Sequence, residues 1–178
     1  MTMRKRYGHG LTALSCLLLV ACGTYYHNVS YLPQADDPGW PGGVHACAAG
    51  KIQTTGIFHE PKKYESAFGI PLPYNYNNQL PLVWLAIDSE LLKEKACSAG
   101  LVELEGETGQ TIPAERVHAN LSSAYNGYDV FCYYYFPASV LAENTYTLKF
   151  NAADTHCPIP DMHVSRTEKT GYRAEQLQ

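Results

Sequence analysis

The dipeptide Asn126-Gly127, which lies between two strand-like segments, constrains the fold of this 178-residue chain more than any other feature. Asn and Gly readily adopt the backbone angles of a two-residue β-turn, and the flanking segments Arg116–Tyr125 and Tyr128–Phe136 are rich in β-forming residues. The sequence therefore predicts an antiparallel hairpin. With a two-residue turn, Tyr125 lies opposite Tyr128, and the same register places Leu121 opposite Cys132.

This register gives the predicted hairpin two different faces. The first is apolar and is expected to line the core; it holds Val117, Ala119, Leu121, Val130, Cys132 and Phe136. The second holds Phe131, Tyr133 and Tyr135, with Ser122, Asn120 and His118 as their predicted cross-strand partners. Because monomers rarely expose several large rings without a use, we expect Phe131, Tyr133, Tyr135 and His118 to form a partner-binding surface. The alternative is that Tyr64–Tyr76 or the chain before Val44 covers these rings.

Several other segments have strand patterns. The unbroken apolar run Leu82–Ile87 predicts a buried strand with Trp84 as a possible core residue, and Gly56 is expected to break Lys51–Phe58 into short strands. Leu101–Glu105 and the end of Leu141–Phe150 predict two more strands, the second being the last of the domain. A short helical turn is expected between Asp88 and Gly100. Proline and asparagine in Gly69–Gln79 predict a loop.

Two of these segments resemble bacterial Ig-like domains. Leu141-Ala142-Glu143-Asn144-Thr145-Tyr146-Thr147-Leu148-Lys149-Phe150 is similar to their closing motif, in which a leucine and a turn precede a Thr-x-Tyr-Thr strand. Leu85-Ala86-Ile87-Asp88-Ser89-Glu90-Leu91 resembles a strand and turn of the same group. The resemblance covers roughly residues 82–150 and implies an all-β, Ig-like antiparallel β-sandwich. It implies no particular activity, because such sandwiches host many functions.

The N-terminal residues have the pattern of an export signal. Arg4, Lys5 and Arg6 precede the apolar run Leu14–Gly23, which is shorter than the roughly 20 residues that span a bilayer. The run ends in Leu19-Val20-Ala21-Cys22, which resembles the lipobox of bacterial lipoproteins. The resemblance implies that residues 1–21 are removed and that Cys22 is acylated and anchors the chain. The alternative is an ordinary signal peptide with a chance cysteine.

The residue after the cysteine bears on location. Gly23 stands where an aspartate would resemble the signal for inner-membrane retention, so the resemblance implies the periplasmic face of the outer membrane. Beyond the signal we expect a lipidated, Pro- and Gly-rich tether over residues 22–43, a sandwich domain over 44–157 and a flexible tail over 158–178.

Charge excludes some classes of partner. Residues 1–21 hold three of the 13 basic residues and none of the 17 acidic ones, so the remaining 157 residues carry a formal charge of −7. This balance argues against nucleic acid as a partner and against an electrostatic attraction to anionic headgroups. The basic residues near the C-terminus are interpreted as part of a solvated tail.

Cysteine usage predicts a disulfide framework. Once Cys16 and Cys22 are set aside, Cys47, Cys97, Cys132 and Cys157 remain, an even number in an oxidising compartment. No Cys-x-x-Cys pair is present, which argues against a zinc ribbon or a thioredoxin-like motif. Three pairings are possible, and we favour Cys97–Cys132 with Cys47–Cys157.

No catalytic motif, cofactor motif or phosphate-binding loop is found in the sequence, so we expect a non-enzymatic binding or assembly component of the cell envelope without a cofactor. The first alternative is a copper carrier, because His156, Cys157, Met162 and His163 lie within eight residues and imidazole and sulfur suit copper. Against it, Cys157 is expected in a disulfide. The second alternative is an enzyme inhibitor that presents Gly69–Gln79 as a rigid loop.

Overall fold

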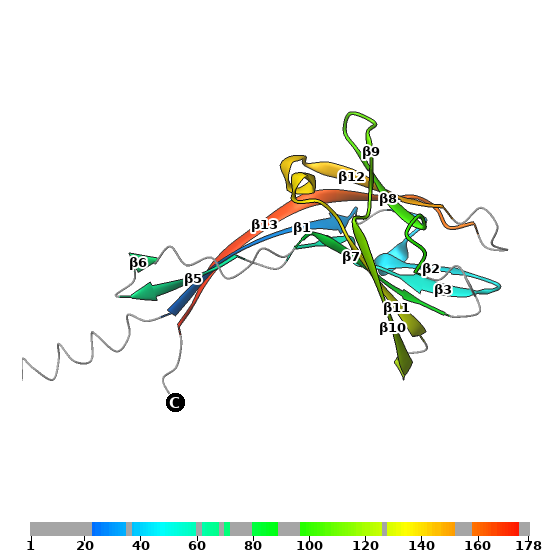
Figure 1. Cartoon of the computed structure of the whole chain (residues 1–178), viewed down its shortest axis with the longest axis horizontal. Coiled ribbons are helices and arrows are strands. Elements are labelled where there is room, and N and C mark those ends of the chain that lie inside the picture. Colours follow the sequence, from blue (N-terminus) through cyan, green and yellow to red (C-terminus); the bar gives the residue numbers. More distant parts are fainter. Residues whose placement is uncertain are drawn as a thin grey trace, which may run out of the picture. The chain divides into compact units, whose positions relative to one another are not determined.

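The computed structural model of the chain describes residues 23–34, 37–59, 62–67, 70–71, 80–88, 97–125, 128–151 and 158–174. These residues form an all-β structure, and no α-helix is found among them (Figure 1). The strands are β1 (Gly23–Pro33), β2 (Val44–Cys47), β3 (Gly50–Gln53), β4 (Ile57–Phe58), β5 (Lys62–Ala67), β6 (Ile70–Pro71), β7 (Leu82–Ile87), β8 (Val102–Gly106), β9 (Thr111–Pro113), β10 (Arg116–Tyr125), β11 (Tyr128–Tyr135), β12 (Thr145–Phe150) and β13 (Met162–Ala174). Within the described residues, the short 3-10 helices η1 (Pro41–Gly43) and η3 (Ala138–Ala142) connect strands.

Neighbouring strands pair in the order β10-β11-β7-β4-β1-β13-β12-β8-β9. Four further strands pair beside this path: β3 pairs with β7 and β2, and β5 pairs with β1 and β6. The chain divides into two compact units. The first, here called the ribbon, comprises residues 1–28, 61–78 and 169–178, and the second, the core unit, comprises residues 29–60 and 79–168. One boundary between the two units lies within β1, between residues 28 and 29, and another lies within β13, between residues 168 and 169. The candidate site described below belongs entirely to the core unit.

One continuous cluster of buried side chains forms the core of the core unit. Strands from both ends of the order contribute to it, so the inward faces of β11 and β7 share a core with those of β12 and β8. Among its fully buried large residues are Trp40, Tyr31, Tyr134, Phe136, Ile52, Ile57, Leu85, Ile87, Leu101, Leu104, Leu148 and Met162. Along β8, β11 and β12 the core residues alternate with more exposed ones, as the two-residue period of a β-strand requires.

The tether predicted over residues 22–43 is wrong for its described part. Residues 23–33 are strand β1, and Tyr31 and Trp40 are almost completely buried. The Tyr31 hydroxyl donates to the carbonyls of Val140 and Glu143 at 3.0 and 2.8 Å, and Trp40 Nε1 donates to the Pro160 carbonyl at 2.9 Å. The prolines fit because Pro33 ends the strand and Pro41 begins η1, so none occupies an interior ladder position.

The flexible tail predicted over residues 158–178 is also wrong for its described part. Residues 162–174 form β13, the longest strand, and Met162 and Val164 are fully buried while His163 between them is exposed. The sequence predicts no strand here because only the first part of β13 alternates between apolar and polar residues. The core unit therefore extends on both sides beyond the predicted 44–157.

The hairpin is confirmed, with a corrected register. β10 and β11 pair antiparallel with Tyr125 opposite Tyr128, but an irregularity between Leu121 and Tyr125 shifts the rest of the ladder. Leu121 therefore lies opposite Val130 and Ala119 opposite Cys132, two residues from the predicted partners. A shift of two residues leaves each side chain on its predicted side of the hairpin, because side chains alternate with a period of two. The expectation that Ala119 lines the core is wrong, because Ala119 is exposed, whereas Val130, Cys132 and Phe136 are buried.

The remaining predictions have mixed outcomes. The strand at Leu82–Ile87, the break at Gly56 (φ +92°) and the strand after Leu101 are confirmed. β12 is a strand as predicted, although β13 follows it. Most of the predicted helical turn between Asp88 and Gly100 lies outside the described residues, and so does most of the predicted loop Gly69–Gln79. The predicted signal segment, residues 1–21, and Cys22 lie entirely outside them.

The disulfide Cys97–Cys132 is confirmed, and it closes a loop of 35 residues in the core unit. Cys132 is fully buried, as its place on the inward face of the hairpin predicts. Cys47 is disulfide-bonded as well. Its pairing with Cys157 stays a prediction, because Cys157 lies outside the described residues.

Candidate functional site

The outward surface of β11 and β7 carries large aromatic side chains. Phe131, Tyr133 and Tyr135 alternate along β11 with the buried residues Cys132 and Tyr134. The neighbouring strands add outward residues to the same surface. We call this surface the aromatic face and define it as Phe58, Leu82, Trp84, Phe131, Tyr133 and Tyr135.

Strand register places these side chains in adjacent rows. Tyr133 pairs with Trp84, and Tyr135 pairs with Leu82, which in turn pairs with Phe58 of β4. Directly paired residues on one side of a sheet have Cβ atoms about 4.5–5.5 Å apart, so the rows form one contiguous surface. Phe58 is 39% exposed, and the other five are partly exposed.

Contacts from neighbouring residues hold the rings in place. The guanidinium carbon of Arg116, on β10, lies 4.2 Å from the centre of the Tyr135 ring, a cation–π contact. The His118 ring, on the same strand, lies 6.2 Å from that of Tyr133. Trp84 Nε1 donates to Thr55 Oγ1 at 2.9 Å. The indole N–H of Trp84 thus has a hydrogen-bond acceptor, and the guanidinium of Arg116 contacts an aromatic ring. The exposed parts of the rings provide apolar contact area.

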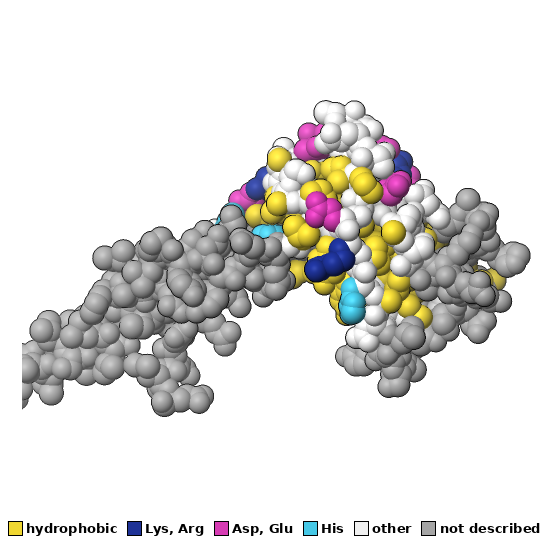
Figure 2. Space-filling view, viewed as in Figure 1, with side chains coloured by type: hydrophobic (Ala, Val, Ile, Leu, Met, Phe, Trp, Pro, Cys, Tyr) yellow, Lys and Arg dark blue, Asp and Glu magenta, His cyan; other side chains and the backbone are white. Residues whose placement is uncertain are grey.

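The predicted surface residues are thus brought together. Phe131, Tyr133 and Tyr135 share one face with His118, although His118 pairs with Tyr133 rather than with Tyr135. In Figure 2, hydrophobic side chains lie exposed among polar ones on the visible side of the core unit, with a basic and a histidine side chain close to each other among them.

Sequence reasoning missed the contributions of Trp84, Leu82 and Phe58. The sequence predicts Trp84 as a possible core residue, but its side chain points outward and is partly exposed. An unbroken apolar run such as Leu82–Ile87 does not show which alternate residues point inward. The pairing of Trp84 with Tyr133 and of Leu82 with Tyr135 depends on contacts between distant segments, which no local pattern specifies.

Strand β10 lies at one end of the strand order and beside the aromatic face. Among the described strands its only neighbour is β11, so no described strand pairs with its other side. His118, Ala119 and Asn120 are exposed along it. Open edges can accept an added strand from a partner through backbone hydrogen bonds. The aromatic face and this edge together form a continuous candidate interface.

The outward surface of β8, β12 and the start of β13 is chemically different. We call it the charged face and define it as Glu103, Glu105, Thr145, Thr147, Lys149 and His163. Lys149 Nζ lies 2.8 Å from Asp161 and 3.6 Å from Glu105. Because the hydrogen bond to Asp161 stabilises the protonated amine, the pKa of Lys149 is raised. The charge of Lys149 is therefore paired with carboxylates of the protein itself.

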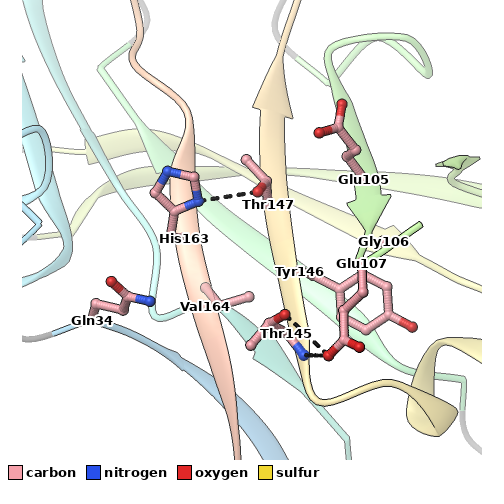
Figure 3. Close-up of a pocket in the computed structure, with 9 residues that line it drawn as sticks. All are labelled: Gln34, Glu105, Gly106, Glu107, Thr145, Tyr146, Thr147, His163 and Val164. Carbon is pink, nitrogen blue, oxygen red and sulfur yellow. Dashed lines mark hydrogen bonds between the residues drawn. The ribbon is translucent and has the colours of Figure 1, made fainter. Parts of the chain in front are cut away.

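A pocket of about 300 Å³ opens in the charged face (Figure 3). It is lined by Gln34, Glu105, Gly106, Glu107, Thr145, Tyr146, Thr147, His163 and Val164. Glu107 Oε1 accepts hydrogen bonds from the backbone amides of Asn144 and Thr145 and from the Thr145 hydroxyl. Thr147 Oγ1 and His163 Nδ1 are hydrogen-bonded at 3.1 Å. Much of the polar lining is thus engaged within the protein.

A second carboxylate closes the same network. Glu143 accepts hydrogen bonds from the Glu107 amide at 2.6 Å and from Gln110 Nε2 at 2.8 Å, so the turn after β8 and the loop before β12 are tied together reciprocally. In the part of the chain that the structure describes, no group of three or more His, Cys, Asp or Glu residues is arranged to hold a metal ion. The hydrogen bonds of Glu107 and Glu143 therefore join the two loops beside the pocket.

The structure separates two of the candidate copper ligands. Met162 is fully buried in the core, whereas His163 is exposed and bonded to Thr147. Adjacent residues of a strand point to opposite faces, so these two side chains cannot bind one ion together. His156 and Cys157 lie outside the described residues. The copper-carrier alternative is therefore weakened.

Buried tyrosines account for the largest pKa shifts. Burial raises the pKa of Tyr146 to about 12, and it also raises the pKa of Tyr31 and Tyr134. The Tyr134 hydroxyl is buried and has no hydrogen-bond partner among the described residues. All three hydroxyls stay protonated at neutral pH, and none of them belongs to the aromatic face.

Comparisons with known proteins give no family for this chain. No protein-family model, no curated protein and no solved structure matches it. A search of the described residues for a helix of sufficient length and apolarity to cross a membrane found none.

Proposed function

We propose that this chain is a lipid-anchored, periplasmic component of the outer membrane that binds a protein of the cell envelope through the aromatic face. Acylation of Cys22, inferred from the lipobox resemblance, would supply the anchor. The role is one of binding or assembly rather than catalysis. The observation that carries the proposal is the contiguous surface of six large side chains, five of them aromatic, on the outward side of β11, β7 and β4.

The composition of this surface favours a protein partner. Interfaces are enriched in tyrosine, tryptophan, phenylalanine and arginine, and the aromatic face with Arg116 holds all four. Trp84 and Tyr133, paired at the centre of the surface, are the residue types that most often dominate binding energy. The side of β10 that no described strand pairs with would add a route for backbone pairing with the same partner.

We further propose that the core unit is an Ig-like β-sandwich. Two features support this architecture beyond the sequence resemblance. Strands from both ends of the strand order place inward residues in one shared core, and the disulfide joins Cys97 to the fully buried Cys132 of β11. In a sandwich one side of each sheet is solvated, which gives the aromatic face and the charged face equivalent positions on the two sheets.

The double variant Tyr133→Ser/Tyr135→Ser tests the binding role. Crosslinking in intact envelopes followed by mass spectrometry identifies the partner of the wild-type chain. The variant is expected to lose that crosslink, because two rings leave the centre of the surface. Its melting temperature is expected to stay within about 2 °C of the wild type, since both side chains are partly exposed.

Thr145→Ala/Thr147→Ala on the charged face is the matched control, and it should keep the crosslink. A large fall in the melting temperature of the tyrosine variant would show that the rings are internal packing. An unchanged crosslink in a folded tyrosine variant would contradict the proposal. The anchor is tested separately, because Cys22→Ser should abolish labelling by a palmitate analogue and leave the precursor unprocessed.

A further inference from the structure

Arg116 is an exposed cation on a strongly acidic unit. The core unit holds six Lys or Arg residues and 15 acidic ones, which gives it a formal charge of −9. Within this unit, Lys149 pairs with Asp161 at 2.8 Å, and Arg166 pairs with Glu168 at 2.6 Å. Arg116 differs from both, because no carboxylate among the described residues pairs with it. Its charge is therefore available to a ligand.

The aromatic face holds the guanidinium of Arg116 in position. The central carbon of this group lies 4.2 Å from the centre of the Tyr135 ring. A guanidinium has five N–H donors in a fixed fork and no acceptor, and a contact with a ring leaves most of these donors unused. The two oxygens of a carboxylate match this fork and form the strongest hydrogen bonds with it. The ring contact thus orients a group that suits a carboxylate.

His118 lies next to Arg116 on the same side of β10. The two residues are two positions apart in the strand, so their side chains leave the backbone about 7 Å from each other. His118 is exposed, and the centre of its ring lies 6.2 Å from that of the Tyr133 ring. An imidazole has at least one N–H donor in either charge state. The β10 side of the aromatic face therefore presents two neighbouring groups that can donate to an acidic ligand.

The register of the strands gives the aromatic face two chemically different ends. It arranges the side chains in two rows that begin on β10, namely Arg116, Tyr135, Leu82 and Phe58, and His118, Tyr133 and Trp84. Because neighbouring strands are about 4.8 Å apart, the first row is roughly 14 Å long. Nitrogen donors lie at its β10 end, and apolar side chains lie at its β7 and β4 end. A ligand that matches the whole row is acidic at one end and apolar at the other.

We infer that Arg116 determines the specificity of the aromatic face by binding a carboxylate of the partner protein, while apolar side chains of the same partner segment cover β7 and β4. The inference rests on the proposed function, because it names the chemistry of the partner that this face binds. A neutral segment would cover the guanidinium without offering it an acceptor, which costs free energy where water is excluded. The remaining acidic residues of the core unit repel a carboxylate, so the position of Arg116 also fixes the orientation of the segment.

Short probe peptides test the inference. Acetyl-Glu-Ser-Leu-Ser-Leu-amide is the acidic probe, and glutamine or lysine replaces the glutamate in two matched probes. Alternate side chains of an extended peptide lie on one side, and the first and fifth are about 14 Å apart, which equals the length of the row from Arg116 to Phe58. Each probe is titrated into the purified full-length protein in non-ionic detergent, and the indole N–H signals are followed by NMR. Trp84 reports on the aromatic face, and the buried Trp40, whose indole donates to Pro160, is the internal reference.

The acidic probe should bind most tightly. We expect the Kd from the Trp84 signal to be at least about fivefold lower for the acidic probe than for the glutamine probe, because hydrogen bonds between charged groups are stronger than neutral ones. The lysine probe should bind most weakly, and the Trp40 signal should not move. Salt at about 0.5 M should reduce the preference, since the site is exposed. Equal Kd values for the acidic and glutamine probes, or no shift of the Trp84 signal with the acidic probe, would overturn the inference.

Substitutions assign the preference to one charge. Arg116→Gln should bring the Kd of the acidic probe to within about twofold of that of the glutamine probe, with an unchanged melting temperature because the side chain is exposed. Arg116→Lys keeps the charge and should keep a preference for the acidic probe. Lys149→Gln, on the charged face, is the matched control and should behave like the wild type. A preference that survives Arg116→Gln, or that Arg116→Lys loses, would contradict the assignment.

The proposed function and this inference fail in different experiments. If Tyr133→Ser/Tyr135→Ser keeps the envelope crosslink, the binding role is wrong, and the probe titration still shows whether Arg116 selects a carboxylate. If that crosslink is lost as expected, it should also weaken in Arg116→Gln and persist in Lys149→Gln. A crosslink that Arg116→Gln leaves unchanged would keep the proposed function intact and overturn only the inference about the carboxylate.

Discussion

The aromatic face and the charged face belong to the same core unit and cover the same buried cluster, yet their outward chemistry is opposite. On the charged face, Lys149 is paired with Asp161 and Glu105, and Glu103 accepts a hydrogen bond from Asn151. Water solvates such groups well. On the aromatic face, Trp84 pairs with Tyr133 and presents apolar area to the outside. The shared core needs only the inward side chains of these strands, and we propose that the difference between the outward faces reflects a partner bound by the aromatic face alone.

The largest expected effect is on the free energy of unfolding, and it distinguishes inward from outward side chains of β7. Leu85→Ala should lower the free energy of unfolding by about 3 kcal/mol, because Leu85 is fully buried and its loss leaves a cavity. Leu82→Ala, on the aromatic face, should cost less than about 1 kcal/mol. Urea denaturation of both variants measures the difference. Equal losses would show that Leu82 is covered in the folded chain and that the aromatic face is not open.

A second prediction concerns binding rather than folding. Trp84→Ala should weaken binding of the crosslinked partner by about 2 kcal/mol, roughly 30-fold in Kd, because a tryptophan at the centre of an interface is a typical hot spot. Thr147→Ala at the charged face should leave Kd unchanged. Titration of the purified partner against each variant gives the comparison. Equal Kd values for the two variants would remove the distinction between the faces.

The third prediction compares two buried tyrosines on the inward side. Tyr134, beneath the aromatic face, has a hydroxyl without a partner among the described residues, whereas the Tyr31 hydroxyl donates to backbone carbonyls near η3. Tyr134→Phe should raise the free energy of unfolding by about 1 kcal/mol, and Tyr31→Phe should lower it by about the same amount. Chemical denaturation provides both values. A loss of stability in Tyr134→Phe would reveal a bonded hydroxyl.

The smallest effect is expected on the charged face. Lys149→Met should change the free energy of unfolding by less than about 0.5 kcal/mol, because Lys149 and Asp161 are both solvent-accessible. The pKa of Lys149 is raised in the folded chain, so the stabilisation from its pairs is fully present below pH 10.5, its ordinary value, and is lost as the pH rises through the raised value. Thermal melts of wild type and variant between pH 7 and pH 11 should therefore converge at high pH.

Local patterns predicted part of this fold correctly. The turn at Asn126-Gly127 and the alternation around it identified the hairpin and the inward position of Cys132, because a turn and a two-residue period are local properties. The shift between Leu121 and Tyr125 could not be foreseen, since an irregularity inside a strand has no simple sequence signal. It did not change the assignment of faces.

The termini of the domain were predicted wrongly for a physical reason. Prolines and glycines near Pro33 and Trp40 are typical of linkers, and the residues after Ser165 are mostly polar. β1 and β13 are nevertheless strands, because Tyr31, Trp40 and Met162 enter a core that other segments build. Tertiary packing overrides local composition at such places. For the same reason the contributions of Leu82 and Phe58 to the aromatic face emerged only from strand order.

The comparison between the two faces is tested most directly by site-specific photo-crosslinking in intact cells. A photoreactive phenylalanine analogue replaces Tyr133 in one variant and Thr147 in the other, which places the same probe on the aromatic face and on the charged face. We expect a discrete adduct from position 133, its loss when Trp84→Ala is added, and no adduct from position 147. The absence of an adduct at position 133, or the same adduct from both positions, would contradict the assignment of the aromatic face as the partner-binding surface.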